Sequence, residues 1–517
     1  MKKIKVIDLF AGPGGLGEGF SQFKKNNSNF FDVKLSIEKD SVACKTLLTR
    51  KFYRKIQNEN SKSNYNKYIN GNISIDNLFQ LNQTEFKEAR KEVLELDICK
   101  KNRKELDTKI QSALNGDKKW VLIGGPPCQA YSIAGRTRIL GKKPLKDEEK
   151  YRKDANQYKK DLEIYNKKLN EFSKDERHEL YTEYIRIISK FSPSIFIMEN
   201  VQGILSSTIK PGKHEKIINR IMEDLKSPNS VTKSKNKTTY NLFPLVKSES
   251  KLNEFSPKDF LINSEDYGVP QTRKRVIIVG YRNDLIKKDN LFLKKEKMQD
   301  LKSTIDDLPK MRSIITNRGK VNDNLNRWIK EISNSFKNIH IKDKEFKKFV
   351  KENIKKLSDS KDYFENKANK MIPNHETRMH LIKDIQRYFY SSCFSRFYER
   401  SPKIEDFPIN LIPKHKNINK NNLKNTIFKD RFRVQLENDP SKTITSHISK
   451  DGHYFIHYDP LQSRSFSVRE AARVQTFPDN YFFEGNKTQQ YVQVGNAVPP
   501  LLAQKIASIV AENLDSN

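Results

Sequence analysis

Cysteine is scarce in this sequence. Among its 517 residues are four cysteines, Cys44, Cys99, Cys128 and Cys393, and no two of them stand in a Cys-x-x-Cys arrangement. This spacing argues against a structural zinc site and against a disulfide framework, so we expect no bound metal. Long apolar runs are missing too, because no stretch approaches the roughly 18 residues of a membrane-spanning helix. We therefore expect a protein of the reducing cytoplasm that has no membrane partner.

Acidic residues are too few to balance the basic ones. The chain has 64 Asp and Glu against 98 Lys and Arg, which leaves a formal net charge of +34. An imbalance of this size predicts a polyanionic partner, with nucleic acid as the first hypothesis. An AT-rich coding bias that raises Lys and Asn throughout explains some of the excess. Only 35% of the residues are hydrophobic, but the length still allows two or three domains with a large core.

Glycines mark the first candidate site. A predicted strand at 5–10 runs into a turn with the pattern G-x-G-x-x-G at 12–17, and this turn opens a helix. These glycines permit a tight turn and a close approach of the backbone to a ligand. A second strand at 35–37 ends in Glu38, whose carboxylate can accept hydrogen bonds from both hydroxyls of a ribose. The pattern indicates a nucleoside-containing cofactor, either a dinucleotide or S-adenosylmethionine.

The next apolar run, at 93–98, carries Asp97 near its end. This carboxylate is placed to accept a hydrogen bond from an adenine amine, and a solvated surface aspartate is an equally good local explanation. Residues 51–85 are polar and rich in Asn, Ser and Lys, so we interpret them as an inserted, partly mobile surface segment.

A thiol follows the buried run at 120–123. The sequence Gly124-Gly125-Pro126-Pro127-Cys128-Gln129 gives this strand a stiff, sharply turned exit, which presents Cys128 at the carboxyl edge of a sheet. Ligands bind at that edge in open α/β sheets, and a thiolate there can act as a nucleophile. A buried, inert cysteine is the alternative. The small residues at 129–138 suit a loop that closes over a substrate.

Two helices and a further strand follow. From Tyr151 to Phe172, apolar and small residues recur in steps of four and three. This heptad seam predicts a protruding helix, which either packs on its own domain or joins a coiled-coil partner. A helical pattern at 179–189 precedes a strand at 194–198, which ends in Glu199, a second reactive side chain at the end of a strand. Another helix is predicted at about 214–225.

Two arginines lie at the end of the segment 267–275, around which we predict paired strands at 260–264 and 275–281. Arg273 and Arg275 alternate onto one face of an extended segment, which makes a fork suited to phosphate or carboxylate. Such a pair is usually just solvated, so its meaning depends on its neighbours.

The residues from 285 to about 455 differ in character. They are Lys-rich and largely helical through Leu357, then irregular, and strand-like again at 443–445 and 454–456, so we expect a separate basic module. His375 and His380 are five residues apart and do not share a helix face as zinc ligands must.

The last stretch returns to the first domain. A helix opens at Ser467 with Glu470 three positions on, which is the pattern of a capping box. Residues 493–500 are expected to form a tight turn, which opens the final helix at 501–514.

Taken in this order, these segments resemble the DNA cytosine-5 methyltransferases of bacterial restriction-modification systems. The likeness covers roughly residues 1–285 and 455–515. The matching segments are Asp8-Leu9-Phe10-Ala11-Gly12-x-Gly14-Gly15, Gly125-Pro126-Pro127-Cys128-Gln129, Glu199-Asn200-Val201, Gln271-x-Arg273-x-Arg275, the helix and turn at 469–478, and Gln493-x-Gly495-Asn496.

The resemblance implies an α/β fold. It would be a Rossmann-like S-adenosylmethionine-dependent methyltransferase sheet with a smaller, basic target-recognition domain. The catalytic domain would span 1–284, with insertions at about 51–90 and 139–174. The target-recognition domain would span 285–455, where 443–445 resembles a short threonine motif. Residues 456–517 would return to the catalytic domain.

The resemblance also implies S-adenosylmethionine as cofactor. Phe10 would stack on the adenine, Glu38 would hold the ribose, and Asp97 with Ile98 would contact the base. Two departures from the family are Lys39, where some members carry an aromatic residue, and Ala497, where a serine is often found. The expected cofactor residues are Phe10, Ala11, Gly12, Gly14, Gly15, Leu16, Glu38, Asp97, Ile98, Pro127, Leu180, Asn496 and Ala497.

Four residues are expected to carry the chemistry. The Cys128 thiolate would add to C6 of cytosine, which places electron density on C5. A protonated Glu199 would stabilise the negative charge that develops at N3. Arg275 would pair with the carbonyl of the base or support Glu199, and Arg273 would bind the adjoining phosphate. No metal is required.

The implied substrate is double-stranded DNA with the target cytosine rotated out of the stack. The basic module would read the surrounding sequence in the major groove while lysines hold phosphates. A restriction endonuclease of the same system is the further partner implied, without a stable complex, and we expect a monomer associated with the nucleoid.

Three other functions compete with this interpretation. An RNA cytosine-5 methyltransferase shares the scaffold, but its recognition region should be small or absent. A non-catalytic DNA-binding regulator would not need Cys128, Glu199 and the glycine loop together. An NAD-dependent oxidoreductase is suggested only by the glycines at 12–17, and it leaves the Pro-Pro-Cys loop and the charge unexplained.

Overall fold

The fold is taken from a computed structural model. It describes residues 2–127, 154–173, 177–207, 216–232, 234, 237–247, 255–285, 292–317, 320, 321, 323–337, 339–359, 372–414, 418, 423, 426 and 429–515. Within these residues no helix is long and apolar enough to cross a membrane. Cys128, the loop at 129–138 and Tyr151 lie outside the described residues, as does part of the predicted insertion at 139–174.

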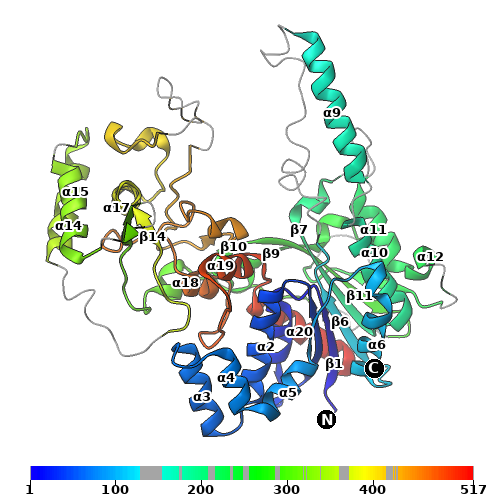
Figure 1. Ribbon diagram of the computed structural model, residues 1–517. Coiled ribbons are helices and arrows are strands. Elements are labelled where there is room, and N and C mark those ends of the chain that lie inside the picture. Colours follow the sequence, from blue (N-terminus) through cyan, green and yellow to red (C-terminus); the bar gives the residue numbers. More distant parts are fainter. Residues whose placement is uncertain are drawn as a thin grey trace.

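An eight-stranded sheet forms the centre of the larger lobe (Figure 1). Its order is β5-β4-β1-β6-β7-β11-β8, with β9 paired to β11, and the first five of these strands are parallel. β11 runs antiparallel to β7, β8 and β9. The strands are β1 (Ile4–Leu9), β4 (Phe31–Glu38), β5 (Val93–Glu95), β6 (Trp120–Gly124), β7 (Ile195–Val201), β8 (Tyr240–Phe243), β9 (Leu261–Asn263) and β11 (Lys274–Arg282).

Helices cover both faces of the sheet because its strands are apolar on both sides. In β1, Ile7 and Leu9 pack toward one helical layer, and Val6 packs toward the other. The first layer contains α6 (Arg103–Leu114), α10 (Arg177–Phe191) and α11 (Ile217–Lys226), and the second contains α1 (Gly15–Gln22) and α20 (Pro500–Asp515). This three-layer arrangement confirms the predicted α/β fold.

Residues 51–85, interpreted as an inserted and partly mobile surface segment, are largely helical. The segment continues α2 and then forms further helices around a small core of Phe52, Tyr65, Leu78 and Ala89. Its Asn and Ser residues partly serve as helix caps: the Ser74 hydroxyl, for example, accepts a hydrogen bond from the Asn77 amide. The helices are α2 (Ser41–Lys55), α3 (Glu59–Ile69), α4 (Ile75–Leu81) and α5 (Gln83–Lys91).

The predicted protruding helix is present as α9 (Ala155–Ser173), which projects from the larger lobe (Figure 1). Three residues of its heptad seam, Tyr158, Leu162 and Tyr165, are half-buried. Ile164, next to the seam, is 55% exposed.

A second lobe contains most of the predicted target-recognition domain at 285–455, which we call the recognition region (Figure 1). Two of its helices, α14 and α15, confirm the predicted helical character for the second half of the stretch through Leu357, whereas 314–317 and 320–321 form strands. The irregular structure expected after it is partly wrong, because 382–398 forms a long helix, α17, whose residues are buried on several sides and therefore show no simple stripe. The elements are α13 (Leu301–Ile305), β12 (Ile314–Asn317), β13 (Lys320–Val321), α14 (Leu325–Lys337), α15 (Lys344–Ser358), β14 (Met379–Leu381) and α17 (Ile382–Tyr398).

The predicted strands at 443–445 and 454–456 are also not formed as such. The strand β15 (Ser441–Lys442) ends before Thr443 and pairs with β10 (Gln271–Thr272). Ile456 makes only isolated bridges, to Val434 and Ser465. The Thr443 hydroxyl donates to the Thr272 carbonyl, and the Ile444 amide donates to the Gln271 side chain. The backbone of Ile456 bonds instead to Arg433 and Gln435.

The core of the recognition region continues into the C-terminal return. One apolar cluster includes Leu301 and Phe346 from the recognition region and also Ala471 of α18 (Val468–Val474) and Val494 of α19 (Lys487–Asn496). This core therefore extends across the predicted domain boundary at 455. The tight turn expected at 493–500 is wrong in its first half, because 493–496 form the last turn of α19.

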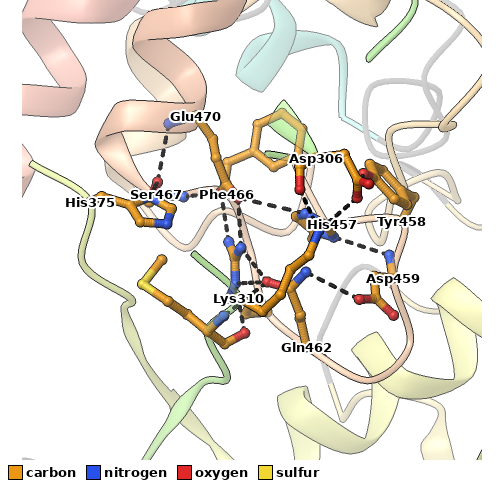
Figure 2. Close-up of polar contacts among 12 residues, drawn as sticks. Asp306, Lys310, His375, His457, Tyr458, Asp459, Gln462, Phe466, Ser467 and Glu470 are labelled. Atoms are coloured by element: carbon orange, nitrogen blue, oxygen red, sulfur yellow. Dashed lines mark hydrogen bonds and ion pairs between the residues drawn. The ribbon is translucent and has the colours of Figure 1, made fainter. Parts of the chain in front are cut away.

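A polar network joins the same two parts (Figure 2). The Arg464 guanidinium donates two hydrogen bonds of 2.6 Å to the Glu470 carboxylate, and both residues are 1% exposed. Glu470 also completes the predicted capping box with Ser467, which is confirmed.

The remaining short elements are β2 (Lys24–Lys25), β3 (Ser28–Asn29), α12 (Pro228–Thr232) and single turns of 3-10 helix at Lys100–Asn102, Gln202–Leu205, Pro257–Phe260, Ser264–Tyr267, Ile404–Asp406, Ile409–Leu411 and Ser446–Ser449.

Candidate active site

A cavity of about 470 Å³ opens at the carboxyl ends of the parallel strands. Its volume is in the range of sites for small ligands and cofactors. The cavity is lined by Phe10 after β1, Glu38 at the end of β4, the loop after β6, and Glu199 near the end of β7. The last turn of α19 closes the cavity on the remaining side.

The loop after β1 is held in an unusual conformation. Phe10 has a φ of 55°, which is uncommon for a residue with a side chain and often marks a functional position. The Ala11 amide donates to the Ile37 carbonyl at 3.0 Å, and the Gly12 amide donates to Glu38 Oε2 at 2.9 Å. The ends of β1 and β4 are thus tied together around the cavity.

Glu38 is fixed before any ligand arrives. Its Oε1 accepts hydrogen bonds from the backbone amides of Lys39 and Asp40, each at 2.9 Å. Each carboxylate oxygen can accept two hydrogen bonds. Oε2, which accepts from Gly12, can therefore take a further donor from the cavity.

The structure brings the predicted cofactor residues together. All of them are described, and twelve line the cavity: Phe10, Ala11, Gly12, Gly15, Leu16, Glu38, Asp97, Ile98, Pro127, Leu180, Asn496 and Ala497. The exception is Gly14, which precedes α1 and lies close to the side chains of Leu47 and Tyr481.

Several lining residues were not predicted. Thr488, Gln489 and Val492 come from α19, a helix that was not predicted. Asp8 also lines the cavity, and the alternation of β1 could have placed it on the face opposite Ile7. Burial raises the pKa of the Asp8 carboxyl to about 8, although nearby Lys51 opposes the shift.

Glu199 and Arg275 form an ion pair inside the cavity. The distance from Arg275 Nε to Glu199 Oε1 is 2.7 Å, and both side chains are largely buried. Antiparallel pairing places Arg275 opposite Val201, so the arginine reaches the carboxyl end of β7. Of the two expectations for Arg275, this geometry is the one in which it supports Glu199.

The loop after β6 lies against this pair. A Cβ at Gly125 would be 2.9 Å from Glu199 Oε2, so glycine permits the close approach. The side-chain amide of Asn200 donates to the Pro126 carbonyl at 3.5 Å, which connects β7 to the loop. Pro127 lines the cavity and is the last described residue before Cys128, the predicted nucleophile.

The prediction that Arg273 and Arg275 form an exposed fork is wrong. Arg273 is 0% exposed, and its guanidinium donates to the carbonyls of Ile444 at 2.7 Å and Ala497 at 2.8 Å. The extended segment is interrupted at Arg273, between β10 and β11, so the alternation that would put both arginines on one face does not hold. Arg273 is therefore not available to a phosphate in this structure.

The described side chains that could bind a metal ion are dispersed. Cys44, Cys99 and Cys393 are free thiols. Across the described ranges, no three His, Cys, Asp or Glu side chains gather in a way that could hold a metal ion.

Comparison with known proteins connects this geometry to a family. The family model of the C-5 cytosine-specific DNA methylases matches residues 166–512. The chain belongs to this family. It is a DNA cytosine-5 methyltransferase with the α/β fold of S-adenosylmethionine-dependent methyltransferases.

Relatives of this methyltransferase match along the whole chain. The type II methyltransferase M.Bpa9945I of Bacillus paralicheniformis is 30% identical over 536 residues, which cover 99% of each protein. M.DdeI of Desulfomicrobium norvegicum is 25% identical and covers 98% of this chain and 88% of its own length. A solved structure from E. coli, described as a prophage-encoded DNA modification methyltransferase, has a TM-score of 0.50 at 18% identity, with 99% of this chain and 100% of that chain covered. That likeness supports the fold.

Proposed function

We propose that this methyltransferase transfers a methyl group from S-adenosylmethionine to C5 of a cytosine that is rotated out of a specific duplex site, through a bond between Cys128 Sγ and C6. The observation that carries this proposal is the shared cavity. Glu199, Arg275 and the Pro126-Pro127 loop line the same space as Phe10, Glu38 and Asp97. A base and a cofactor bound there would meet at the carboxyl edge of the sheet.

The cavity residues fit S-adenosylmethionine. Phe10 offers an aromatic face for the adenine, Glu38 Oε2 can accept a ribose hydroxyl, and Asp97 can accept the adenine amine. When bound, the cofactor supplies an electrophilic methyl group on sulfur. Asn496 and Ala497 form the opposite wall, so the position of the α19 end decides how tightly the cofactor is enclosed.

Cytosine C5 becomes nucleophilic only after the aromatic ring is broken. The Cys128 thiolate attacks C6 and forms an S–C6 bond, while an electron pair moves toward C5 and N3. A carboxyl group of Glu199 that carries a proton donates to N3 and accepts from the exocyclic amine. Arg275 holds Glu199 Oε1, which keeps the carboxyl group oriented toward the base. After C5 has taken the methyl group, a base removes the C5 proton, the S–C6 bond breaks, and the thiolate leaves.

This chemistry requires a base outside the helix. C6 is shielded in a duplex, so the nucleotide must rotate into the cavity, at a cost of a few kcal/mol in lost stacking and pairing. The recognition region and the net charge of +34 supply contacts to the surrounding duplex. We propose that the region from 285 to 455 reads the target sequence.

The named relatives M.Bpa9945I and M.DdeI are type II methyltransferases. We therefore propose that this enzyme is the modification partner of a restriction endonuclease. It would act in the cytoplasm as a monomer associated with the nucleoid, and no stable complex with the endonuclease is required.

Trapping of the covalent complex tests the mechanism. Duplex DNA of mixed sequence, with 5-fluorocytosine in place of cytosine, is incubated with the enzyme and S-adenosylmethionine. Fluorine at C5 cannot leave as a proton does, so the S–C6 bond should persist under denaturing electrophoresis, and mass spectrometry should find it on the peptide that contains Cys128.

Two variants make the trapping result specific. Cys128→Ala should give no adduct and should lower methyl transfer at least about a thousandfold. Cys393→Ala removes a buried thiol of α17 and should still form the adduct. Methyl transfer by Cys128→Ala at a rate near that of the wild type would refute the covalent mechanism.

A further inference from the structure

The C-terminal end of α19 is capped by side chains from distant parts of the chain. A helix leaves its last carbonyl groups without partners inside the helix. The side-chain amide of Gln475 donates to the Val494 carbonyl at 2.7 Å and to the Ala497 carbonyl at 3.3 Å. Arg273 Nη2 donates to Ala497 at 2.8 Å and to Gly495 at 3.4 Å. This cap fixes the residues that form one wall of the cofactor cavity.

Arg273 contacts the recognition side with its other terminal nitrogen. Nη1 donates to the Ile444 carbonyl at 2.7 Å. Gln271, two residues earlier, accepts from the Ile444 amide at 3.0 Å and donates to Gln475 at 2.7 Å. Gln271 and Arg273 thus bind the amide and the carbonyl group of Ile444, while Arg273 also binds the end of α19.

Glycine at 495 brings these two segments into direct contact. A Cβ there would lie 2.3 Å from the Thr445 carbonyl carbon and 2.4 Å from the Ser446 amide nitrogen. The residues after Ile444 therefore rest on the last turn of α19 without an intervening side chain. A displacement of 443–449 must be transmitted to the end of α19.

The charge of the buried Arg273 guanidinium is stabilised by its contacts with Ile444 and with the end of α19. Burial, together with the nearby charge of Arg275, holds its pKa well below the usual value. The nearby Glu199 charge opposes this shift, and the Arg273 Nε has no hydrogen-bond partner among the described residues. The negative end of the α19 dipole and three carbonyl groups also compensate the charge. If either segment moves away, part of that compensation is lost.

We propose that Arg273 is a positioning residue that couples DNA bound by the recognition region to cofactor bound in the cavity. DNA that stabilises 443–449 in this position against α19 keeps the cap intact, and the intact cap holds Asn496 and Ala497 against the cofactor. The inference rests on the proposed function in placing the cofactor at that wall. Coupling of this kind is reciprocal, so cofactor also tightens the binding of DNA by the same factor.

Calorimetric titration measures the coupling directly. The dissociation constant of S-adenosylhomocysteine is determined for the full chain with and without duplex DNA that contains the site located by methylation mapping. For the wild type we expect DNA to tighten binding about tenfold. Arg273→Met should reduce that factor to about one, and Arg273→Lys should leave an intermediate factor because one ammonium group cannot reach three carbonyls at once.

Arg282→Met is the matched control. Arg282 lies at the opposite end of β11, where its guanidinium donates to the Ser192 carbonyl at 2.7 Å and pairs with Asp284. We expect its coupling factor to equal that of the wild type. If Arg273→Met is insoluble, the Arg273→Lys variant decides the question, since a loss of charge is not involved.

The outcomes separate this inference from the proposed function. Wild-type coupling in Arg273→Lys and Arg273→Met, or no coupling in the wild type, overturns the positioning role while cofactor binding stands. An equal loss in Arg282→Met shows general destabilisation and also overturns it. Failure of the wild type to bind S-adenosylhomocysteine at all contradicts the proposed cofactor site.

Discussion

The sheet and the recognition region bury polar side chains in different ways. On the helices that flank the sheet, Glu18 of α1 is 2% exposed and pairs with Arg50 and Arg54 of α2, both at 2.5 Å. In the core that the recognition region shares with the C-terminal return, His380 and His457 are buried, and burial lowers their pKa values to about 3 and about 4. Glu18 is thus buried as part of an ion pair, whereas the two histidines are buried as neutral side chains.

The difference indicates where each region is vulnerable. A buried ion pair is costly to break because one charge is left without its partner. A buried neutral histidine carries no such penalty at neutral pH. As the pH falls, the unfolded chain binds protons that the folded chain excludes, and the free energy of unfolding decreases. We therefore expect substitutions of charged residues to affect the sheet most and acid to affect the recognition region most.

Removal of the Glu18 charge should have the largest effect. Glu18→Gln leaves Arg50 and Arg54 without a carboxylate, since Glu18 bonds to both. We expect the free energy of unfolding to fall by about 3 to 5 kcal/mol in denaturant titrations. Glu59→Gln, at an exposed pair with Lys62, is the control and should change it by less than about 0.5 kcal/mol. Similar values for the two variants would show that the buried pair is not the source of stability.

Acid should destabilise the recognition region. The folded pKa values of His380 and His457 lie below the unfolded value of about 6.5, so their contribution is complete above that value. It is lost as the pH falls from about 6.5 toward about 4. At pH 5 we expect a loss of about 2 kcal/mol for each histidine.

His457 offers the sharper test of this pH dependence. Its Nε2 lies 3.6 Å from Glu470 Oε1 (Figure 2), and the charges of Arg464, Asp459 and Lys310 also act on its pKa. His457→Gln should be less stable at pH 7.5 but should lose about 2 kcal/mol less than the wild type between pH 7.5 and pH 5. Thermal unfolding monitored by near-UV circular dichroism checks this, and identical pH profiles would rule out the histidine as the cause.

Helix caps should give the smallest effects and a direct comparison of the regions. Asp40 caps α2 by accepting from the Ala43 amide at 2.8 Å, and Ser467 caps α18 by accepting from the Glu470 amide at 3.1 Å. Replacement by Ala should cost about 1 kcal/mol at either site. Ser467→Ala should be the more destabilising, because Ser467 is buried and also bonds to His375 at 3.0 Å. Equal losses would mean that the histidine contact adds nothing.

Local signals explain why the sheet could be predicted. Short apolar runs bounded by glycine, proline or an acidic residue define β1, β4 and β6. In a parallel sheet their carboxyl ends meet at one edge, so Glu38 and Glu199 could be assigned to a common site before the fold was known.

The recognition region and Arg273 could not be predicted in the same way. α17 is buried on several sides and therefore shows no amphipathic stripe. The conformation of Arg273 is set by the carbonyls of Ile444 and Ala497, which lie 171 and 224 residues away in the sequence. The polar residues at 51–85 resembled a loop because their caps were visible and the small core beneath them was not.

The shared cavity is proposed to be the place where this enzyme methylates C5 of cytosine in duplex DNA. The most direct test uses S-adenosylmethionine labelled in the methyl group with mixed-sequence duplex DNA, followed by digestion to nucleosides, chromatography and conversion sequencing. We expect label in 5-methylcytosine at one short repeated site. Label in another methylated nucleoside, or in RNA but not in DNA, would contradict it.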